Sequence, residues 1–299
     1  AWQGPSVLGG DDDIVARLFD ADGSTRLALD GDWDGFMNAV DWDDDGNLDL
    51  LLGGYTGLVY LYLRKEGGEL GKGEPLRTED GALLHVAGFS TPRAVDWNGN
   101  GENDLVCGDF LGRVHVFLNV GTNASPRLKP GERLRVAGRE FAFGPRAMVE
   151  VADWNGDGRK DVLLGNRAGK LVALINDGSA SEPHYGHLEP LRDDSDVWRE
   201  LYGGAWASPR AASMPLYNRR EGGVGVLDVV ATACPRVVDW DGDGLQDLVI
   251  NHGRTMDTAP AVLRNIGTKT NPRFDFPKRL ACWGQKLTGI AKHGPYYGV

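Results

Sequence analysis

A nine-residue motif occurs four times in the chain and constrains the fold more than any other feature. Each copy begins with Asp-Trp and ends with Asp, and the copies span residues 41–49, 96–104, 153–161 and 239–247. Successive copies start 55, 57 and 86 residues apart, so the last interval holds an insertion of about 30 residues. A repeat of this period is typical of proteins built from supersecondary units, each of which packs against its neighbours.

The segments around each motif also repeat. A short apolar run follows every copy, at 50–54, 105–108, 162–165 and 248–250. A turn with Gly comes next, and then a segment in which apolar residues alternate, such as 112–119 or 169–176. Short strands separated by such turns predict an all-β fold. Four strands per unit of about 50 residues predict a β-propeller made of four-stranded antiparallel blades.

The two ends of the chain suggest the number of blades. Residues 6–29 resemble strands two to four of a unit without its first strand, and residues 294–299 resemble a first strand. We therefore expect five blades, with the last closed by strands from both termini, because closure removes exposed sheet edges. The alternative is a fragment of a larger propeller. In either case we expect residues 1–299 to form a single propeller domain, with an insertion at about 193–225.

Composition excludes several classes of protein. The net charge of −11 argues against a nucleic-acid-binding protein, which needs a basic face, and we expect no such partner. No apolar stretch approaches the roughly 18 residues of a membrane span. Cys107, Cys234 and Cys282 lack the paired spacing of a zinc site and allow at most one disulfide. The chain starts at Ala1 without Met or a signal peptide, which is typical of a mature chain or an excised piece.

The motif itself predicts a cation site. Positions 1, 3, 5 and 9 carry thirteen Asp and three Asn in total, and position 6 is always Gly. Oxygen ligands on alternate residues of a tight turn suit Ca²⁺, and Gly permits the sharp bend. An EF-hand would need Glu at position 12, which here is an apolar strand residue. We expect about four structural Ca²⁺ ions; the alternative is a set of Asp-rich turns without an ion.

The predicted metal ligands are Asp41, Asp43, Asp45, Asp49, Asp96, Asn98, Asn100, Asp104, Asp153, Asn155, Asp157, Asp161, Asp239, Asp241, Asp243 and Asp247. The Trp at position 2 of each copy also repeats, at Trp42, Trp97, Trp154 and Trp240. Four equivalent copies in a structural loop favour packing between blades over ligand binding.

The D-x-[DN]-x-[DN]-G-x-x-D motif resembles the FG-GAP/VCBS-type calcium-binding β-propeller repeat. A literal Phe-Gly and Gly-Ala-Pro pair is absent, so the similarity is closer to the VCBS-like form. The resemblance implies that each calcium loop joins the first and second strands of a blade. It also implies an extracellular, periplasmic or cell-surface setting, with relatives among adhesion receptors, lectin-like proteins and polysaccharide lyases. Function varies across such folds, so the fold alone does not settle it.

The face opposite the calcium loops is the expected ligand face, because its loops depart from the repeat. The insertion holds Trp198, Tyr202, Trp206 and Tyr217, which either plug the mouth of the propeller or stack on a ligand. The turns between second and third strands add residues 11–13, Tyr55, 109–110 with Phe110, 166–167 with Arg167, and 251–257, which is the longest of these turns. Three arginines follow Pro at the entrances to first strands, namely Arg93, Arg146 and Arg236. Arginine suits carboxylate or sulfate groups, although each could instead pair with an Asp of a neighbouring blade.

These features predict a calcium-stabilised propeller that binds carbohydrate, with an acidic glycan as the expected ligand. The first alternative is a polysaccharide lyase acting on a uronate-containing glycan. In that case Arg236 or Arg254 would neutralise the uronate, His252 would act as the base and Tyr297 as the acid. The second alternative is a protein–protein adhesion module.

Overall fold

The computed structural model describes residues 36–65, 68–167, 170–191, 233–251, 260–275, 278–279, 281–282 and 285–286. Within these ranges every regular element is a β-strand. None of the described residues form a helix with the length and hydrophobicity that a membrane span requires.

Sixteen of the strands form four antiparallel sheets, and in each sheet the strands are paired in sequence order. The first sheet contains β1 (Phe36–Val40), β2 (Asp49–Gly53), β3 (Val59–Tyr62) and β4 (Glu74–Pro75). The second contains β5 (Thr91–Val95), β6 (Asp104–Gly108), β7 (Val114–Phe117) and β8 (Glu132–Arg133). The third contains β11 (Met148–Ala152), β12 (Asp161–Gly165), β13 (Leu171–Asn176) and β14 (Tyr185–Pro190). The fourth contains β15 (Cys234–Val238), β16 (Asp247–Asn251), β17 (Ala261–Leu263) and β18 (Lys278–Arg279).

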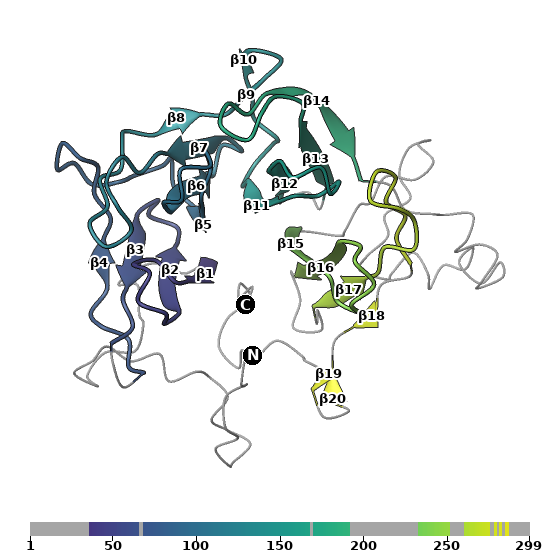
Figure 1. Cartoon of the computed structure of the whole chain (residues 1–299), viewed down its shortest axis with the longest axis horizontal. Coiled ribbons are helices and arrows are strands. Elements are labelled where there is room, and N and C mark those ends of the chain that lie inside the picture. Colours follow the sequence, from purple (N-terminus) through teal and green to yellow (C-terminus); the bar gives the residue numbers. More distant parts are fainter. Residues whose placement is uncertain are drawn as a thin grey trace.

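The sheets are arranged around a ring, with β1, β5, β11 and β15 nearest its centre (Figure 1). The predicted propeller of four-stranded antiparallel blades is confirmed for these four. The expected fifth blade, with its strands at 6–29 and 294–299, lies outside the described residues, as does the insertion at 193–225. Two short hairpins complete the described structure: β9 (Arg135–Val136) with β10 (Arg139–Glu140), and β19 (Ala281–Cys282) with β20 (Gln285–Lys286).

The core lies between successive blades. Every residue of β2, β6 and β12 is buried, which matches the continuous apolar runs of these second strands. Hydrophobic clusters join the first blade to the second, the second to the third and the third to the fourth. A strand buried on both faces needs no alternation of polar and apolar residues, because neither face meets water.

The repeated Trp fills this space between blades. Trp42, Trp97 and Trp154 are at most 6% exposed, and each belongs to the cluster shared with the following blade. Trp97 packs against Tyr185 of the third blade, with ring centroids 6.1 Å apart, and Trp154 packs against Phe274 of the fourth at 5.9 Å. The prediction of interblade packing is confirmed for these three. The fourth copy, Trp240, is 51% exposed in the described structure.

A glycine ends the second strand of three blades because the next blade approaches closely there. A Cβ on Gly53, Gly108 or Gly165 would lie 2.3, 2.2 or 1.9 Å from a backbone carbonyl oxygen just before the first strand of the next blade. Real Cβ atoms do not approach so closely, so these positions admit only hydrogen. In the fourth blade the corresponding residue is Asn251.

Replacing one of these glycines should weaken the interblade contact. We expect Gly165→Ala to lower the free energy of unfolding by about 1–3 kcal/mol, because the new methyl group must push the Ala233 carbonyl away. Urea denaturation followed by tryptophan fluorescence measures the change. Gly71→Ala is the control, since its Cβ would lie 3.0 Å from the nearest atom and should cost less. Equal losses in the two variants would contradict this explanation.

Candidate functional site

The predicted metal ligands lie in four equivalent loops, each of which joins the first strand of a blade to the second, and at the first residue of that second strand. These loops connect β1 to β2, β5 to β6, β11 to β12 and β15 to β16, and we number them loops one to four in that order. Because the loops occupy the same place in each blade, they lie at the same end of their sheets.

The aspartate at position 1 stabilises the turn in each loop by accepting a hydrogen bond from the backbone at position 6. In loop three, Asp153 Oδ2 accepts a hydrogen bond from the backbone N–H of Gly158 at 2.9 Å. The same bond measures 3.0 or 3.1 Å in the other three loops. The Gly at position 6 has a φ of +84° to +88° in all four, a conformation that other residues rarely adopt. The repeated Gly is therefore required by the turn.

The aspartate at position 9 is buried and ties the loop to the third strand. In loop three, Asp161 Oδ2 accepts from Trp154 N–H at 3.0 Å, and Oδ1 accepts from Asn176 N–H at 2.8 Å. The two equivalent bonds measure 2.6–2.9 Å in the other blades. All four position 9 residues, Asp49, Asp104, Asp161 and Asp247, are at most 1% exposed.

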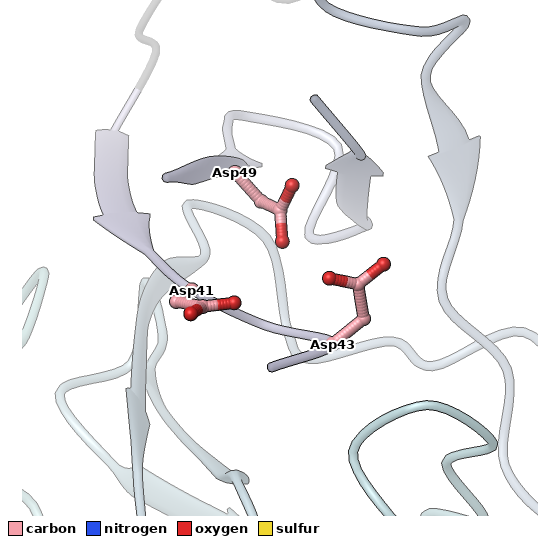
Figure 2. A group of neighbouring side chains, drawn as sticks. All are labelled: Asp41, Asp43 and Asp49. Carbon is pink, nitrogen blue, oxygen red and sulfur yellow. The ribbon is translucent and has the colours of Figure 1, made fainter. Parts of the chain in front are cut away.

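Three carboxylates converge in loop one. The side chains of Asp41, Asp43 and Asp49 point toward one another (Figure 2), and one oxygen from each lies within 4.8 Å of the others. Asp41 Oδ1 and Asp43 Oδ1 are both buried and have no hydrogen-bond partner among the described residues. Buried carboxylate oxygens normally have hydrogen-bond partners. Three converging carboxylates, two of them with an unpaired buried oxygen, therefore provide the oxygen ligands that a cation site requires.

Loop four has the same arrangement, with Asp239, Asp241 and Asp247 within 4.8 Å of one another. Here Arg264 Nη1 lies 3.3 Å from Asp241 Oδ2 and neutralises part of the negative charge. Loops two and three carry Asn98 and Asn155 at position 3, so the described structure groups no three carboxylates there.

The residue at position 5 faces the loop backbone. Asp45 Oδ1 accepts from Asn47 N–H at 2.7 Å, and Asp243 Oδ1 accepts from Leu245 N–H at 2.8 Å. In loop three, Asp157 forms an ion pair with Arg159 at 2.5 Å. The three-carboxylate groups thus contain positions 1, 3 and 9, and the predicted ligand at position 5 is not among them.

The electrostatics of the loops favour neutralisation of the carboxylates. Burial raises the pKa of Asp43, and the neighbouring charges of Asp49 and Asp45 raise it further. Burial raises the pKa of Asp161 to about 6, and it also raises the pKa values of Asp104 and Asp247. A bound cation would offset this cost of keeping the carboxylates charged.

Loop one is also accessible. A surface cavity of about 410 Å³ opens beside Asp43 and is lined in part by Leu61, Arg64 and Lys72. Asp43, one of the three carboxylates, therefore borders a cavity that is open to solvent.

Two residues that the motif analysis did not identify connect loop one to the second blade. Asn103 Nδ2 donates to the backbone oxygens of Asp41 and Trp42, at 2.9 and 3.1 Å. Asn123 Nδ2 donates to Asp44 Oδ2 at 2.7 Å. Asp44 has a φ of +61° at position 4, where the other three loops have Gly. The Asp at a position that is Gly in the other three loops was the sequence feature that could have indicated a special contact of loop one.

The three predicted arginines are engaged with neighbouring side chains. Arg93 and Arg236 both contact Glu150, at 3.1 and 3.4 Å, and so link three consecutive blades. The Arg146 guanidinium stacks over the Phe89 ring, 4.0 Å from its centroid. Arg93 and Arg236 are therefore paired with a neighbouring blade, as the alternative expected, but the partner is Glu150 and not an Asp.

The turns between second and third strands lie at the end of the blades opposite the loops. Tyr55, Phe110 and Arg167 occupy equivalent positions in three blades. Tyr55 is 52% exposed, Arg167 is exposed and Phe110 is partly buried. The other predicted ligand or catalytic residues, Trp198, Tyr202, Trp206, Tyr217, His252, Arg254 and Tyr297, lie outside the described residues.

The raised pKa values predict how stability depends on pH in chelator. A carboxyl group whose pKa is higher in the folded protein than in the unfolded chain favours folding while it is protonated. With an unfolded value near 4 and a folded value of about 6 for Asp161, the melting temperature should fall as the pH rises from 4 to 6.5. Differential scanning calorimetry measures this slope.

Two variants assign the slope to the loop. Asp161→Asn, which cannot titrate, should flatten it. Asp80→Asn should leave it unchanged, because hydrogen bonding to Thr78 lowers the pKa of Asp80, so this group titrates below the window. A slope that survives in Asp161→Asn would contradict the assignment.

Comparison with known proteins agrees with this architecture. Residues 96–164, which include loops two and three, match the family model described as an FG-GAP-like repeat. Cartilage acidic protein 1 of Xenopus tropicalis is 26% identical over 192 residues, which are 61% of this chain and 24% of that protein. The human protein of the same name is 26% identical over 185 residues, 59% of this chain and 22% of that protein. The chain thus spans about a quarter of the length of these curated relatives.

Among solved structures, an Agrocybe aegerita lectin described as recognising non-reducing terminal N-acetylglucosamine is 19% identical. The superposition has a TM-score of 0.43 and covers 81% of this chain and 52% of the lectin. From the four blades and the matched repeat, we conclude that the chain is a β-propeller that carries an FG-GAP-like repeat.

Proposed function

We propose that this chain is an extracellular, calcium-stabilised β-propeller that binds carbohydrate on the face opposite its Asp-rich loops. The calcium part rests on one observation above all: the carboxylates of Asp41, Asp43 and Asp49 converge. One oxygen of Asp41 and one of Asp43 are buried and lack a hydrogen-bond partner among the described residues. The carbohydrate part rests on exposed aromatic and cationic side chains at the opposite turns.

Calcium suits the loops better than other common metals. The candidate ligands are carboxylate and amide oxygens, which hard cations such as Ca²⁺ prefer, and the motif offers no His or Cys ligand. Ca²⁺ also accepts irregular geometry, so backbone carbonyls and water can complete its shell around three carboxylates. When bound, the ion supplies positive charge that offsets the mutual repulsion of these groups. Its role would be structural, because each loop joins the first strand of its blade to the second.

The four loops should differ in affinity. Loop one has three carboxylates at positions 1, 3 and 9, and loop four has the same three with Arg264 beside them. Loops two and three have an amide at position 3, and loop two has a second amide, Asn100, at position 5. Because affinity rises with the charge of the ligand set, loop one should bind most tightly and loop two most weakly.

The opposite face offers groups that suit a sugar. A Tyr ring can stack on the apolar face of a pyranose, and Arg can bind hydroxyl or carboxylate groups. Tyr55 and Arg167 supply these two functions from equivalent turns of different blades. An acidic glycan is the expected ligand, and a protein partner is the alternative outcome of a binding screen.

Removal of calcium should destabilise the protein. Because an ion bound only to the folded state contributes RT ln(1 + [L]/Kd), each site should contribute about 2.7 kcal/mol at a hundredfold excess over its Kd. We expect EGTA to lower the melting temperature and Ca²⁺ to restore it. Elemental analysis should find about four ions per chain.

A matched pair of variants tests loop one. Asp43→Asn removes one of the three carboxylates and should weaken the tightest site in a calorimetric calcium titration, by roughly tenfold or more. Asp80→Asn, an exposed position outside the motif, should have no effect. If EGTA leaves the melting temperature unchanged and the two variants titrate alike, the calcium assignment is wrong.

Tyr55 tests the carbohydrate face. We expect Tyr55→Ala to weaken binding to a panel of immobilised acidic and neutral glycans by roughly tenfold, because the stacking surface is lost. The melting temperature should change little, since this side chain is 52% exposed. Val120→Ala, which removes a partly exposed apolar side chain outside these turns, is the control. Retention of full binding by Tyr55→Ala would exclude this turn as the sugar site.

A further inference from the structure

The central residues of the four innermost strands form a ring of polar side chains. Asn38, Arg93, Glu150 and Arg236 each lie three residues before their Asp-rich loop, in the middle of β1, β5, β11 and β15. Each pairs with the third residue of the second strand in its own blade, so all four have the same register. The strands that carry these residues lie nearest the centre of the ring (Figure 1), so the four residues occupy equivalent middle positions in its innermost layer of strands.

Two cations in this ring share one carboxylate oxygen. Arg93 Nε lies 3.1 Å from Glu150 Oε2, and Arg236 Nη1 lies 3.4 Å from the same atom. Asn38 is neutral, and its Oδ1 accepts from the backbone N–H of Ala94 at 2.8 Å. The described part of the ring therefore carries two positive charges and one negative charge.

The excess positive charge is partly buried. The Arg93 side chain is 6% exposed, that of Glu150 is 14% exposed and that of Arg236 is 37% exposed. Burial lowers the pKa of Arg93, and the positive charge of Arg236 lowers it further. One carboxylate thus leaves repulsion between the two guanidinium groups, and Coulomb interactions are stronger at a partly buried site than in water.

The guanidinium groups also retain donors. Besides Glu150, Arg93 donates through Nη1 to the Pro92 carbonyl, and Arg236 donates through Nη1 to the Pro235 carbonyl at 2.8 Å. Arg236 Nη1 is also 3.6 Å from Cys234 Sγ. Neither Arg93 Nη2 nor Arg236 Nη2 donates a hydrogen bond to another described residue.

We propose that Arg93 and Arg236, on either side of Glu150, form a binding site for a small oxyanion, either a carboxylate or a sulfate group. Guanidinium groups bind such anions through paired, charge-assisted hydrogen bonds. An added negative charge would balance the second cation and relieve the repulsion between the two. The half-exposed Arg236 provides access, and Glu150 competes with the anion for both arginines.

This site is separate from the two sites of the proposed function. Its residues lie in the middle of the innermost strands, whereas the Asp-rich loops and the turn that carries Tyr55 lie at opposite ends of the blades. It can therefore be tested with calcium bound, and its failure would leave the calcium and carbohydrate proposals untouched.

The experiment measures anion binding to the full chain in calcium-containing buffer. Sodium sulfate and sodium galacturonate are titrated separately by calorimetry, against sodium chloride at equal ionic strength. We expect at least one of the two oxyanions to bind with a stoichiometry near one. Binding of galacturonate alone would identify a sugar acid as the source of the anion, and binding of sulfate would identify a free or sugar-linked sulfate.

Three variants distinguish this site from a general salt effect. Arg236→Gln should bind the oxyanion roughly tenfold more weakly, because one charged donor is lost. Glu150→Gln should bind it several-fold more tightly, because the competing carboxylate is gone. Arg133→Gln removes a surface arginine paired with Glu140 and should bind like the wild type.

Oxyanion affinity should fall in Arg236→Gln and rise in Glu150→Gln. A loss of stability could weaken binding in either variant, but it could not produce the tighter binding expected of Glu150→Gln. Absence of oxyanion binding in the wild type would overturn the proposal. Equal binding by the wild type and Arg236→Gln, or no gain in Glu150→Gln, would also overturn it.

Discussion

The rest of each blade depends on two hydrogen bonds that the buried aspartate at position 9 of the motif accepts. Its two carboxylate oxygens accept backbone N–H groups from two separate places, the start of the loop and the residue at or just after the end of the third strand. Charge-assisted bonds of this kind are stronger than bonds between neutral groups, and here they are shielded from water. One side chain thereby sets the path of the loop and its position against the third strand.

The same aspartate positions the packing between blades. Its bond to the N–H at position 2 orients the tryptophan backbone, and in three blades the indole enters the cluster shared with the next blade. Glycine at the end of the second strand then lets the following blade approach within contact of the backbone. Polar bonds in the loop and apolar contacts between blades therefore cooperate, because each repeat supplies both.

Burying these carboxylates has an electrostatic cost. A carboxylate that is at most 1% exposed is costly to keep charged, and burial accordingly raises the pKa of Asp104, Asp161 and Asp247. A divalent cation offers compensation without disturbing the backbone bonds, since Asp41 and Asp43 each keep a buried oxygen free of described hydrogen-bond partners. In the innermost strands the balance of charge is reversed, because two arginines share one glutamate.

Much of this fold could be predicted from the repeat. The motif, the apolar run after it and the turn with Gly are local, and they determined the loop, the buried second strand and the four-stranded blade. The repeated Gly at position 6 has a positive φ in all four loops, and three of the four repeated tryptophans pack between blades as the repeat predicted. The sequence also predicts a cation site in the oxygen-rich loop, since oxygen-bearing residue types at fixed spacing suit a hard cation.

Tertiary structure alone decided which of these groups meet. In loops one and four it brought the carboxylates of positions 1, 3 and 9 together and turned position 5 toward its own backbone, a difference of side-chain direction within one turn. It joined Asn103 and Asn123 to the loop of the preceding blade and placed Arg93 and Arg236 on Glu150. Local spacing determines hydrogen bonds within a unit, whereas contacts between residues 57 to 86 positions apart depend on how the blades are set around the ring.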